Sequence, residues 1–228
     1  MPSDKSLPAS GPEFYYGLSV RKAESRFVPR ILQINKYFNR PVASLIVRAV
    51  FKTRVTANQL TVLSFLIGLG GAFCLFQGQA KLFLVGGVLV QLASVVDCAD
   101  GMLARARRQE SRFGAYLDLV FDRIMEFFLI TGTAYGVYRA TGRTSLLILG
   151  LVGGGLYSLE LTLYYLLKPY FGETELGASA ESRGWLMFLV FVFAATNRLD
   201  WGIYLLFAAA SVIIGVSFVR FVRARNEA

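Results

Sequence analysis

Predominantly apolar segments, separated by short polar stretches, follow one another along most of the chain. Because roughly 20 helical residues cross the hydrocarbon core of a bilayer, segments of this length predict transmembrane helices. We expect six spans, at residues 58–76, 82–105, 113–138, 144–167, 184–197 and 201–222. The fifth is short, with Arg183 and Asn197 at its ends. The connecting loops are short except for 168–183, which is polar.

The pattern is different before the first span. Between Arg21 and Arg54, apolar side chains recur at helical spacing among basic ones, which is typical of a helix lying at a membrane surface. We expect a break at Pro41, because proline removes a helical hydrogen bond. The predicted fold is an all-α integral membrane protein with six transmembrane helices after an N-terminal amphipathic interfacial helix. Its parts are a flexible tail (1–20), the juxtamembrane helix (21–55) and a six-helix transmembrane catalytic domain (56–228).

Small residues recur within the predicted spans. Gly150 and Gly154 have the GxxxG spacing, which lets two helices approach closely. The motif alone leaves two uses open, packing within the chain or a homodimer contact.

Composition adds an orientation to this picture. The net charge is +9, and basic residues lie mostly beside the apolar segments rather than within them. That placement indicates anionic headgroups and topology rather than nucleic acid. An even number of spans puts both termini on one side, together with the basic loop 105–112. The positive-inside rule therefore places the termini and this loop in the cytoplasm, in a multi-pass protein of the cytoplasmic membrane.

Four aspartates occur around this loop: Asp97 and Asp100 at the end of the second span, Asp118 and Asp122 at the start of the third. Spacings of three and four residues put each pair on one helix face. Gathered carboxylates repel one another and require positive charge, and the chain has no histidine to share metal binding. Divalent cations are the natural partner, since hard cations prefer oxygen ligands. Pairing of the aspartates with loop arginines is the simpler alternative.

The acids belong to a longer pattern, Asp97-x-x-Asp100-Gly101-x-x-Ala104-Arg105, eight residues, then Gly114-x-x-x-Asp118-x-x-x-Asp122. It resembles the signature of the CDP-alcohol phosphotransferase family at all eight fixed positions. The segment Val55–Thr61 also resembles the family's entry to the first span, with Ala57 where proline is usual. The resemblance implies transfer of a substituted phosphate from a CDP-linked donor to an acceptor hydroxyl, with release of CMP.

The same resemblance implies roles for individual residues. Two divalent cations, Mg²⁺ or Mn²⁺, would be bound by the aspartates, and Asp122 would also be the general base. The implied residues are Asp97, Asp100, Asp118 and Asp122 for metal, and Gly101, Ala104, Arg105, Gly114, Asn58 and Thr61 for CDP. The resemblance also implies a homodimer.

The acceptor is not specified by the signature. Basic residues outside it could bind a phosphorylated acceptor, as similar positions do in inositol-phosphate-using relatives, and each could equally be an interface anchor. The candidates are Arg183, Lys168, Arg220 and Arg112.

The favoured function is phospholipid biosynthesis with a lipid donor such as CDP-diacylglycerol or CDP-archaeol. A soluble CDP-polyol donor, such as CDP-inositol, is the alternative within the family. Outside it, an aspartate-rich prenyltransferase or a metal-binding membrane transporter could also use clustered acids.

Overall fold

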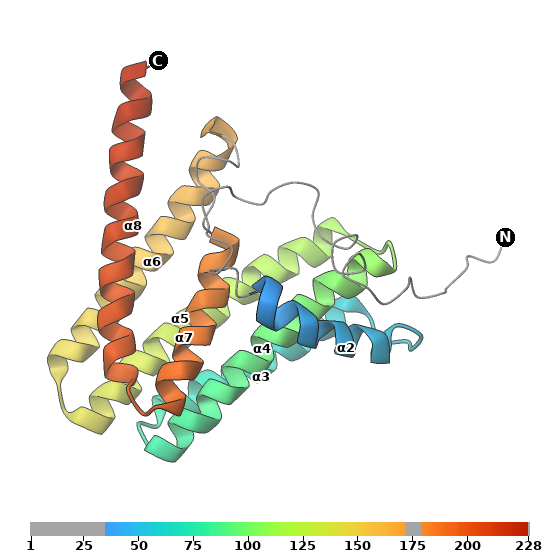
Figure 1. Cartoon of the computed structure of the whole chain (residues 1–228), viewed down its shortest axis with the longest axis horizontal. Helices are drawn as coiled ribbons and strands as arrows, with labels where there is room; N and C mark the ends of the chain where they lie inside the picture. Colours follow the sequence, from blue (N-terminus) through green and yellow to red (C-terminus); the bar gives the residue numbers. More distant parts are fainter. Residues whose placement is uncertain (1–34, 172–178, 228) are drawn as a thin grey trace.

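The computed structural model describes residues 35–171 and 179–227, and these residues form helices joined by short connections, with no strand among them (Figure 1). A short π-helical segment, η2 (Asn35–Asn39), leads into α2 (Arg40–Val50). Six longer helices follow: α3 (Ala57–Phe76), α4 (Ala80–Ala106), α5 (Arg112–Thr141), α6 (Thr144–Phe171), α7 (Ser179–Ala195) and α8 (Leu199–Glu227).

All six segments expected to span the membrane are helices, although their ends differ from the prediction. The largest difference is at the expected loop 168–183, because α6 continues to Phe171 and α7 already begins at Ser179. Within the described residues, three helices are long and apolar enough to cross a membrane: Ala57–Phe76, Ala80–Ala106 and Leu199–Val216. The apolar stretches of α6 and α7 are shorter, and α5 carries several charged residues in its first half. Six spans therefore remain a prediction.

The starts of α3 and α5 are defined by side-chain caps. The Thr56 hydroxyl accepts a hydrogen bond from the Gln59 amide at 3.2 Å, and the Gln59 side chain accepts one from the Thr56 amide at 2.9 Å. At α5, the Ser111 hydroxyl accepts from the Gly114 amide at 3.0 Å. Such caps satisfy amides that a helix leaves unpaired at its first turn. They fix the register of both helices just before the residues of the signature.

Helices α3, α4 and α5 pack against one another through glycines. A Cβ on Gly136 of α5 would overlap the carbonyl oxygen of Leu75 in α3. A Cβ on Gly71 of α3 would lie 2.9 Å from Cγ2 of Val90 in α4. Both added Cβ atoms would lie closer than van der Waals contact, so each helix crossing depends on the glycine having no side chain. The three helices that carry the signature are thereby held at short range.

The GxxxG face of α6 packs within the chain. Gly150 faces Ala134 of α5, where an added Cβ would lie 2.6 Å from the alanine Cβ, and Gly154 faces Ile130 of the same helix. The GxxxG spacing left open packing within the chain or a homodimer contact, and the structure shows packing within the chain.

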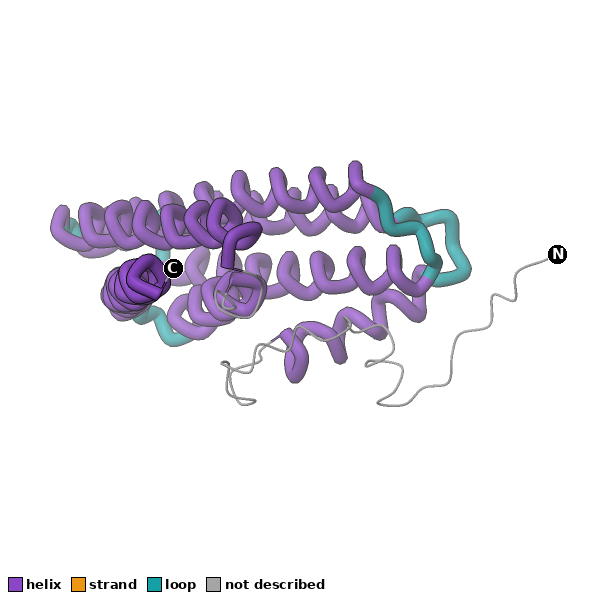
Figure 2. The backbone as a smooth tube through the Cα atoms, turned by 90° about the horizontal axis from the view of Figure 1, so that it is seen from above, coloured by secondary structure: helices purple, strands orange, loops and turns teal. Residues whose placement is uncertain are grey.

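The juxtamembrane segment runs along the outside of the bundle beside α4 (Figures 1 and 2). Its Ala43 and Val47 are fully buried in an apolar cluster with residues of α4, while Val42 and Leu45 are exposed. Pro41 lies in the first turn of α2, where η2 passes directly into the α-helix and the Asn39 backbone stays helical. The expected break is therefore absent from the described residues, and the helix changes from π to α there instead. The predicted tail (1–20) and the start of the predicted helix, up to residue 34, lie outside the described residues.

Candidate active site

The turn between α4 and α5 brings three of the four aspartates together. Asp97, Asp100 and Asp118 each offer a carboxylate oxygen, and these atoms lie within 4.8 Å of one another. Asp100 is buried, and the other two are partly buried. The helix pairing expected from the spacing is thus present for these three residues.

Asp122 is bound by the guanidinium of an arginine from α7. One turn beyond Asp118 on α5, its Oδ2 atom is bound by Nη1 of Arg183, while Nη2 of the same guanidinium binds Oδ2 of Asp97. Arg183 lies in the second turn of α7, and its side chain is 17% exposed. The expected group of four neighbouring carboxylates is therefore divided in this structure. Three form the cluster, and the fourth is joined to it by a buried arginine that neutralises part of its charge.

Thr61 approaches the cluster from α3. Its hydroxyl donates a hydrogen bond of 2.5 Å to Oδ2 of Asp100, and both side chains are buried. A hydrogen bond of this kind fixes the orientation of the carboxylate. The structure thus places Thr61 on a cluster aspartate, and its predicted contact with CDP stays a prediction.

The cluster has the properties of a divalent-cation site. Oδ1 of Asp118 is buried and has no hydrogen-bond partner among the described residues, an arrangement that is costly for a carboxylate. Three convergent carboxylates are the oxygen ligands that hard cations prefer. The side chains present therefore fit the metal that the aspartate pattern predicts.

The remaining signature residues lie around the junction of α3, α4 and α5. The Arg105 guanidinium folds back over Gly101, with Nη1 3.3 Å from where a Cβ on this glycine would be. Gly114 faces Asn58, whose Oδ1 lies 3.0 Å from the corresponding Cβ position. Ala104 lies on the same last turns of α4 and is partly exposed. The two glycines thus give room to neighbouring polar side chains.

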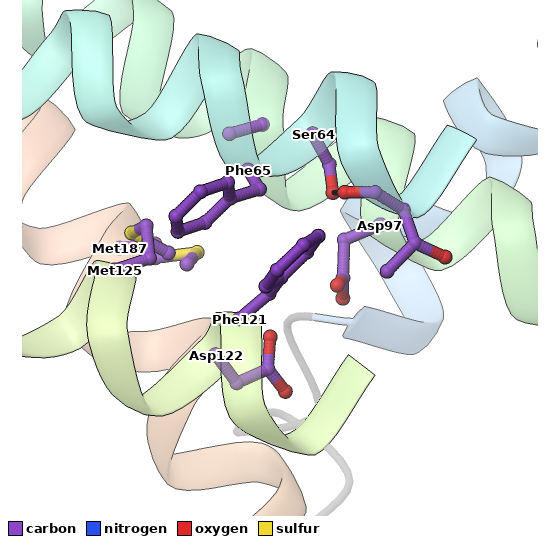
Figure 3. A pocket seen from close by; sticks show the side chains of 9 residues that line it. Ser64, Phe65, Asp97, Phe121, Asp122, Met125 and Met187 are labelled. Atoms are coloured by element: carbon purple, nitrogen blue, oxygen red, sulfur yellow. Dashed lines mark hydrogen bonds between the residues drawn. The ribbon is translucent and has the colours of Figure 1, made fainter. Parts of the chain in front are cut away.

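A small pocket lies beside the carboxylates (Figure 3). Its polar lining consists of Thr61, Ser64, Asp97 and Asp122, and Figure 3 shows the carboxylates of Asp97 and Asp122 near the Phe121 ring. The rest of the lining is apolar and consists of Phe65, Ala93, Phe121, Met125 and Met187. Phe65 and Phe121 stack at 4.3 Å between ring centres. The pocket therefore connects charged groups with an apolar wall inside the bundle.

Of the four acceptor candidates, the structure brings Arg183 into the site. Arg112 is exposed at the first residue of α5. Lys168 and Arg220 lie on α6 and α8, and their side chains are outside the described part of the chain. A role for these three residues stays a prediction.

The structural role of Arg107 was not predicted from the sequence. Its side chain holds the linker between α2 and α3. Its guanidinium donates to the carbonyl oxygens of Val50, Phe51, Thr53 and Val55 at 2.5–3.1 Å. These carbonyl groups lie more than 50 residues before Arg107 in the sequence, so no local sequence pattern predicts the contact.

Two further charged residues lie close to Asp122 on α5, Arg123 directly after it and Glu126 one turn further on. Arg123 and Glu126 form an ion pair with nitrogen–oxygen distances of 2.9 and 3.0 Å, and Glu126 is 3% exposed. The sequence leaves these residues unassigned, and the structure pairs them with each other.

The helical fold and the carboxylate cluster define a membrane-embedded helical protein with an acidic site between its helices. The chain belongs to the CDP-alcohol phosphatidyltransferase family, whose family model matches residues 54–167.

Several relatives and solved structures are similar to this chain. The archaetidylinositol phosphate synthase of Pyrococcus horikoshii is 26% identical, over 86% of this chain and 93% of its own length. The bifunctional IPC transferase and DIPP synthase of Aquifex aeolicus is 38% identical over 44% of this chain, and the match spans 22% of that relative's length. The crystal structure of Mycobacterium tuberculosis phosphatidylinositol phosphate synthase with CDP-DAG bound has a TM-score of 0.62 at 22% identity, covering 76% of this chain and 89% of that one. The last likeness shows a shared fold.

Proposed function

We propose that the protein transfers a lipid-linked phosphate from a CDP-lipid to a hydroxyl of a phosphorylated polyol, with release of CMP, in phospholipid biosynthesis. The observation that carries the proposal is the cluster of Asp97, Asp100 and Asp118 beside a pocket that also contains Asp122. This arrangement supplies candidate metal ligands and, within the same site, a further carboxylate that is paired with Arg183.

In the proposed reaction, Asp122 accepts the proton of the acceptor hydroxyl. The acceptor oxygen then bonds to the phosphorus that carries the lipid, and the bond from this phosphorus to the oxygen of CMP breaks, so that CMP leaves with the electron pair. Two divalent cations, Mg²⁺ or Mn²⁺, held by the four aspartates would neutralise the diphosphate and the departing CMP. Arg105 would bind a donor phosphate, and Gly101 and Gly114 would contact the CDP group.

The acceptor side is assigned to Arg183. Its guanidinium contacts the carboxylate of Asp122, so a group that binds Arg183 lies within reach of the proposed base. Arginine suits phosphate through its planar set of donors. A phosphate on the acceptor that engages Arg183 would bring a neighbouring hydroxyl to Asp122. Inositol phosphate is the favoured acceptor, in keeping with the names of the relatives that match most of this chain.

The lipid donor is favoured by the membrane location and by the apolar wall of the pocket. We place the site and both termini on the cytoplasmic side, where a nucleotide-linked donor and a polar acceptor are available. The transmembrane domain is assigned to residues 56–228, and a homodimer is expected.

The test is CMP release by the purified protein in nanodiscs with Mg²⁺ or Mn²⁺. CDP-diacylglycerol would be offered with inositol phosphate, glycerol 3-phosphate, inositol or serine, and CDP-archaeol would be a second donor. We expect CMP release with a lipid donor and inositol phosphate. CMP release that never depends on an acceptor would contradict the transfer reaction.

Replacement of the proposed base is the sharpest control. Asp122→Asn should lower turnover about 100-fold or more, because proton removal typically contributes at least this factor. Binding of the CDP donor, measured by calorimetry, should change little. Asp200→Asn, at the start of α8, is the matched variant outside the site and should keep wild-type turnover. Near-normal turnover in Asp122→Asn would overturn the base assignment.

A second candidate is transfer from a soluble CDP-polyol, favoured by the 38% identity to the bifunctional IPC transferase and DIPP synthase. CDP-inositol with inositol phosphate is therefore run in parallel. Release of CMP from this pair alone would select the second candidate. Absence of any CDP binding would favour the metal-binding transporter, and turnover of prenyl diphosphates would favour the prenyltransferase.

A further inference from the structure

A network of buried amides joins the juxtamembrane segment to the helix that carries Asp97. Oδ1 of Asn39 accepts a hydrogen bond from Nε2 of Gln91 at 2.7 Å. Its Nδ2 donates to Oγ of Ser94 at 2.9 Å and to Oδ1 of Asn35 at 2.8 Å. Asn39 is 0% exposed, so these contacts satisfy its whole side chain within the protein.

The network continues to the start of α7. The amide of Asn35 lies directly over Gly184, where an added Cβ would be 2.5 Å from Oδ1 and 2.7 Å from Nδ2 of Asn35. One turn further along each helix, Phe38 and Phe188 pack at 5.7 Å between ring centres. The juxtamembrane segment therefore touches α4 and α7 at the same time.

Both ends of this connection lie next to the site. Ser94 precedes Asp97 by three residues on α4, and Gly184 follows Arg183 directly on α7. Arg183 pairs with Asp97 and Asp122, and these two aspartates line the pocket. Asn39 is held in place at the centre of this network, because its buried amide would lose three hydrogen bonds on moving. Oε1 of Gln91 has no hydrogen-bond partner among the described residues.

We propose that Asn39 is a positioning residue, which holds Arg183 against Asp97 and Asp122 through Asn35 and Gly184. The inference rests on the proposed function in that Arg183 acts on the acceptor side. The juxtamembrane helix is then part of the acceptor half of the active site.

The first test compares the change in KM for the acceptor with the change in KM for the CDP donor. Asn39→Ala should raise KM for the phosphorylated acceptor about tenfold, with KM for the CDP donor changed less than twofold. Val47→Ala is the matched control, because Val47 is also 0% exposed on the same segment but packs in the apolar cluster. Equal changes in both KM values, or the same acceptor effect in Val47→Ala, would overturn the inference.

The second test uses the contact at Gly184. Gly184→Ala should reproduce the acceptor effect, because the new methyl group would displace the Asn35 amide. Asn35→Ala, which removes this amide, should raise acceptor KM as Asn39→Ala does, because Asn35 links Asn39 to α7. An unchanged acceptor KM in Asn35→Ala would contradict the proposed path.

A third readout does not depend on activity. Trp185 follows Gly184 directly, and its fluorescence can be followed in a Trp201→Phe background. Asn39→Ala and Gly184→Ala should shift the Trp185 emission maximum, whereas Val47→Ala should not. If the unmodified protein transfers to no acceptor, the proposed function fails. An unshifted Trp185 emission would instead overturn the positioning role.

Discussion

At the scale of single residues, the carboxylate cluster depends on a hydroxyl from a neighbouring helix. Thr61 donates to Asp100, and no other residue of α3 is recorded with a hydrogen bond to the cluster in the described part of the chain. Groups that orient a metal ligand in this way commonly affect metal affinity as strongly as activity. Thr61 therefore links the start of α3 to the metal site.

Removal of this hydroxyl should weaken metal binding. In Thr61→Val, we expect the Mg²⁺ or Mn²⁺ concentration for half-maximal activity to rise about tenfold, and Thr61→Ser should restore most of the loss. The measurement is a metal titration of CMP release. Thr133→Val is the matched control, because its buried hydroxyl has no recorded partner and lies outside the pocket. A similar shift in this control would remove the specific role of Thr61.

Residue spacing predicted a group of four carboxylates, and the structure brings three of them together, because helical periodicity and a short turn largely determine which side chains can meet. It was not sufficient for the contact between Arg183 and Asp97, which are 86 residues apart. The three-dimensional path of α7 decides that contact. The sequence therefore named Arg183 only as one of four basic candidates.

At the scale of helices, the glycine crossing of α5 and α3 sets the distance between the two halves of the site. Gly136→Ala should destabilise the protein by about 1–3 kcal/mol, because its methyl group would collide with the Leu75 carbonyl. Thermal unfolding in detergent measures the loss. Gly70→Ala on α3 meets nothing within 4 Å and should leave the melting temperature unchanged or slightly higher. Equal melting temperatures for the two variants would contradict the role of the crossing.

The linker between α2 and α3 is held by the Arg107 guanidinium rather than by secondary structure. Its exposed Lys52 and Arg54 are potential trypsin sites. Arg107→Gln should speed cleavage at these sites severalfold, because glutamine cannot reach four carbonyl oxygens. Limited proteolysis followed by mass spectrometry measures the rate. The neighbouring exposed variant Arg108→Gln should cleave at the original rate, and faster cleavage there would point to charge alone.

Helix positions followed from the apolar segments, since burial in lipid or protein requires such runs. The ends of the helices were predicted less accurately, because the caps at Thr56 and Ser111 depend on individual polar side chains. The extension of α6 to Phe171 also shows that polar residues near a span can continue its helix.

At the scale of the whole molecule, the distribution of basic residues predicts how the bundle lies in the membrane. Gln109 and Gln79 are exposed at opposite ends of α4, so they provide labelling sites on opposite membrane faces. In a background with Cys74 and Cys98 replaced by alanine, Gln109→Cys should react with an impermeant maleimide only from the cytoplasmic side. Gln79→Cys should react only from the other side. The reverse pattern in intact cells and inverted vesicles would overturn the orientation.

The ion pair and aspartates of α5 have a consequence for biogenesis. A helix with Asp118, Asp122, Arg123 and Glu126 in its first half partitions poorly into lipid on its own. Asp122 pairs with Arg183 of α7, Arg123 and Glu126 pair within the helix itself, and α7 is made after α5. We therefore expect α5 to leave the insertion machinery together with its neighbours rather than alone. The chemistry of the site would then be tied to the order in which the ribosome delivers the helices.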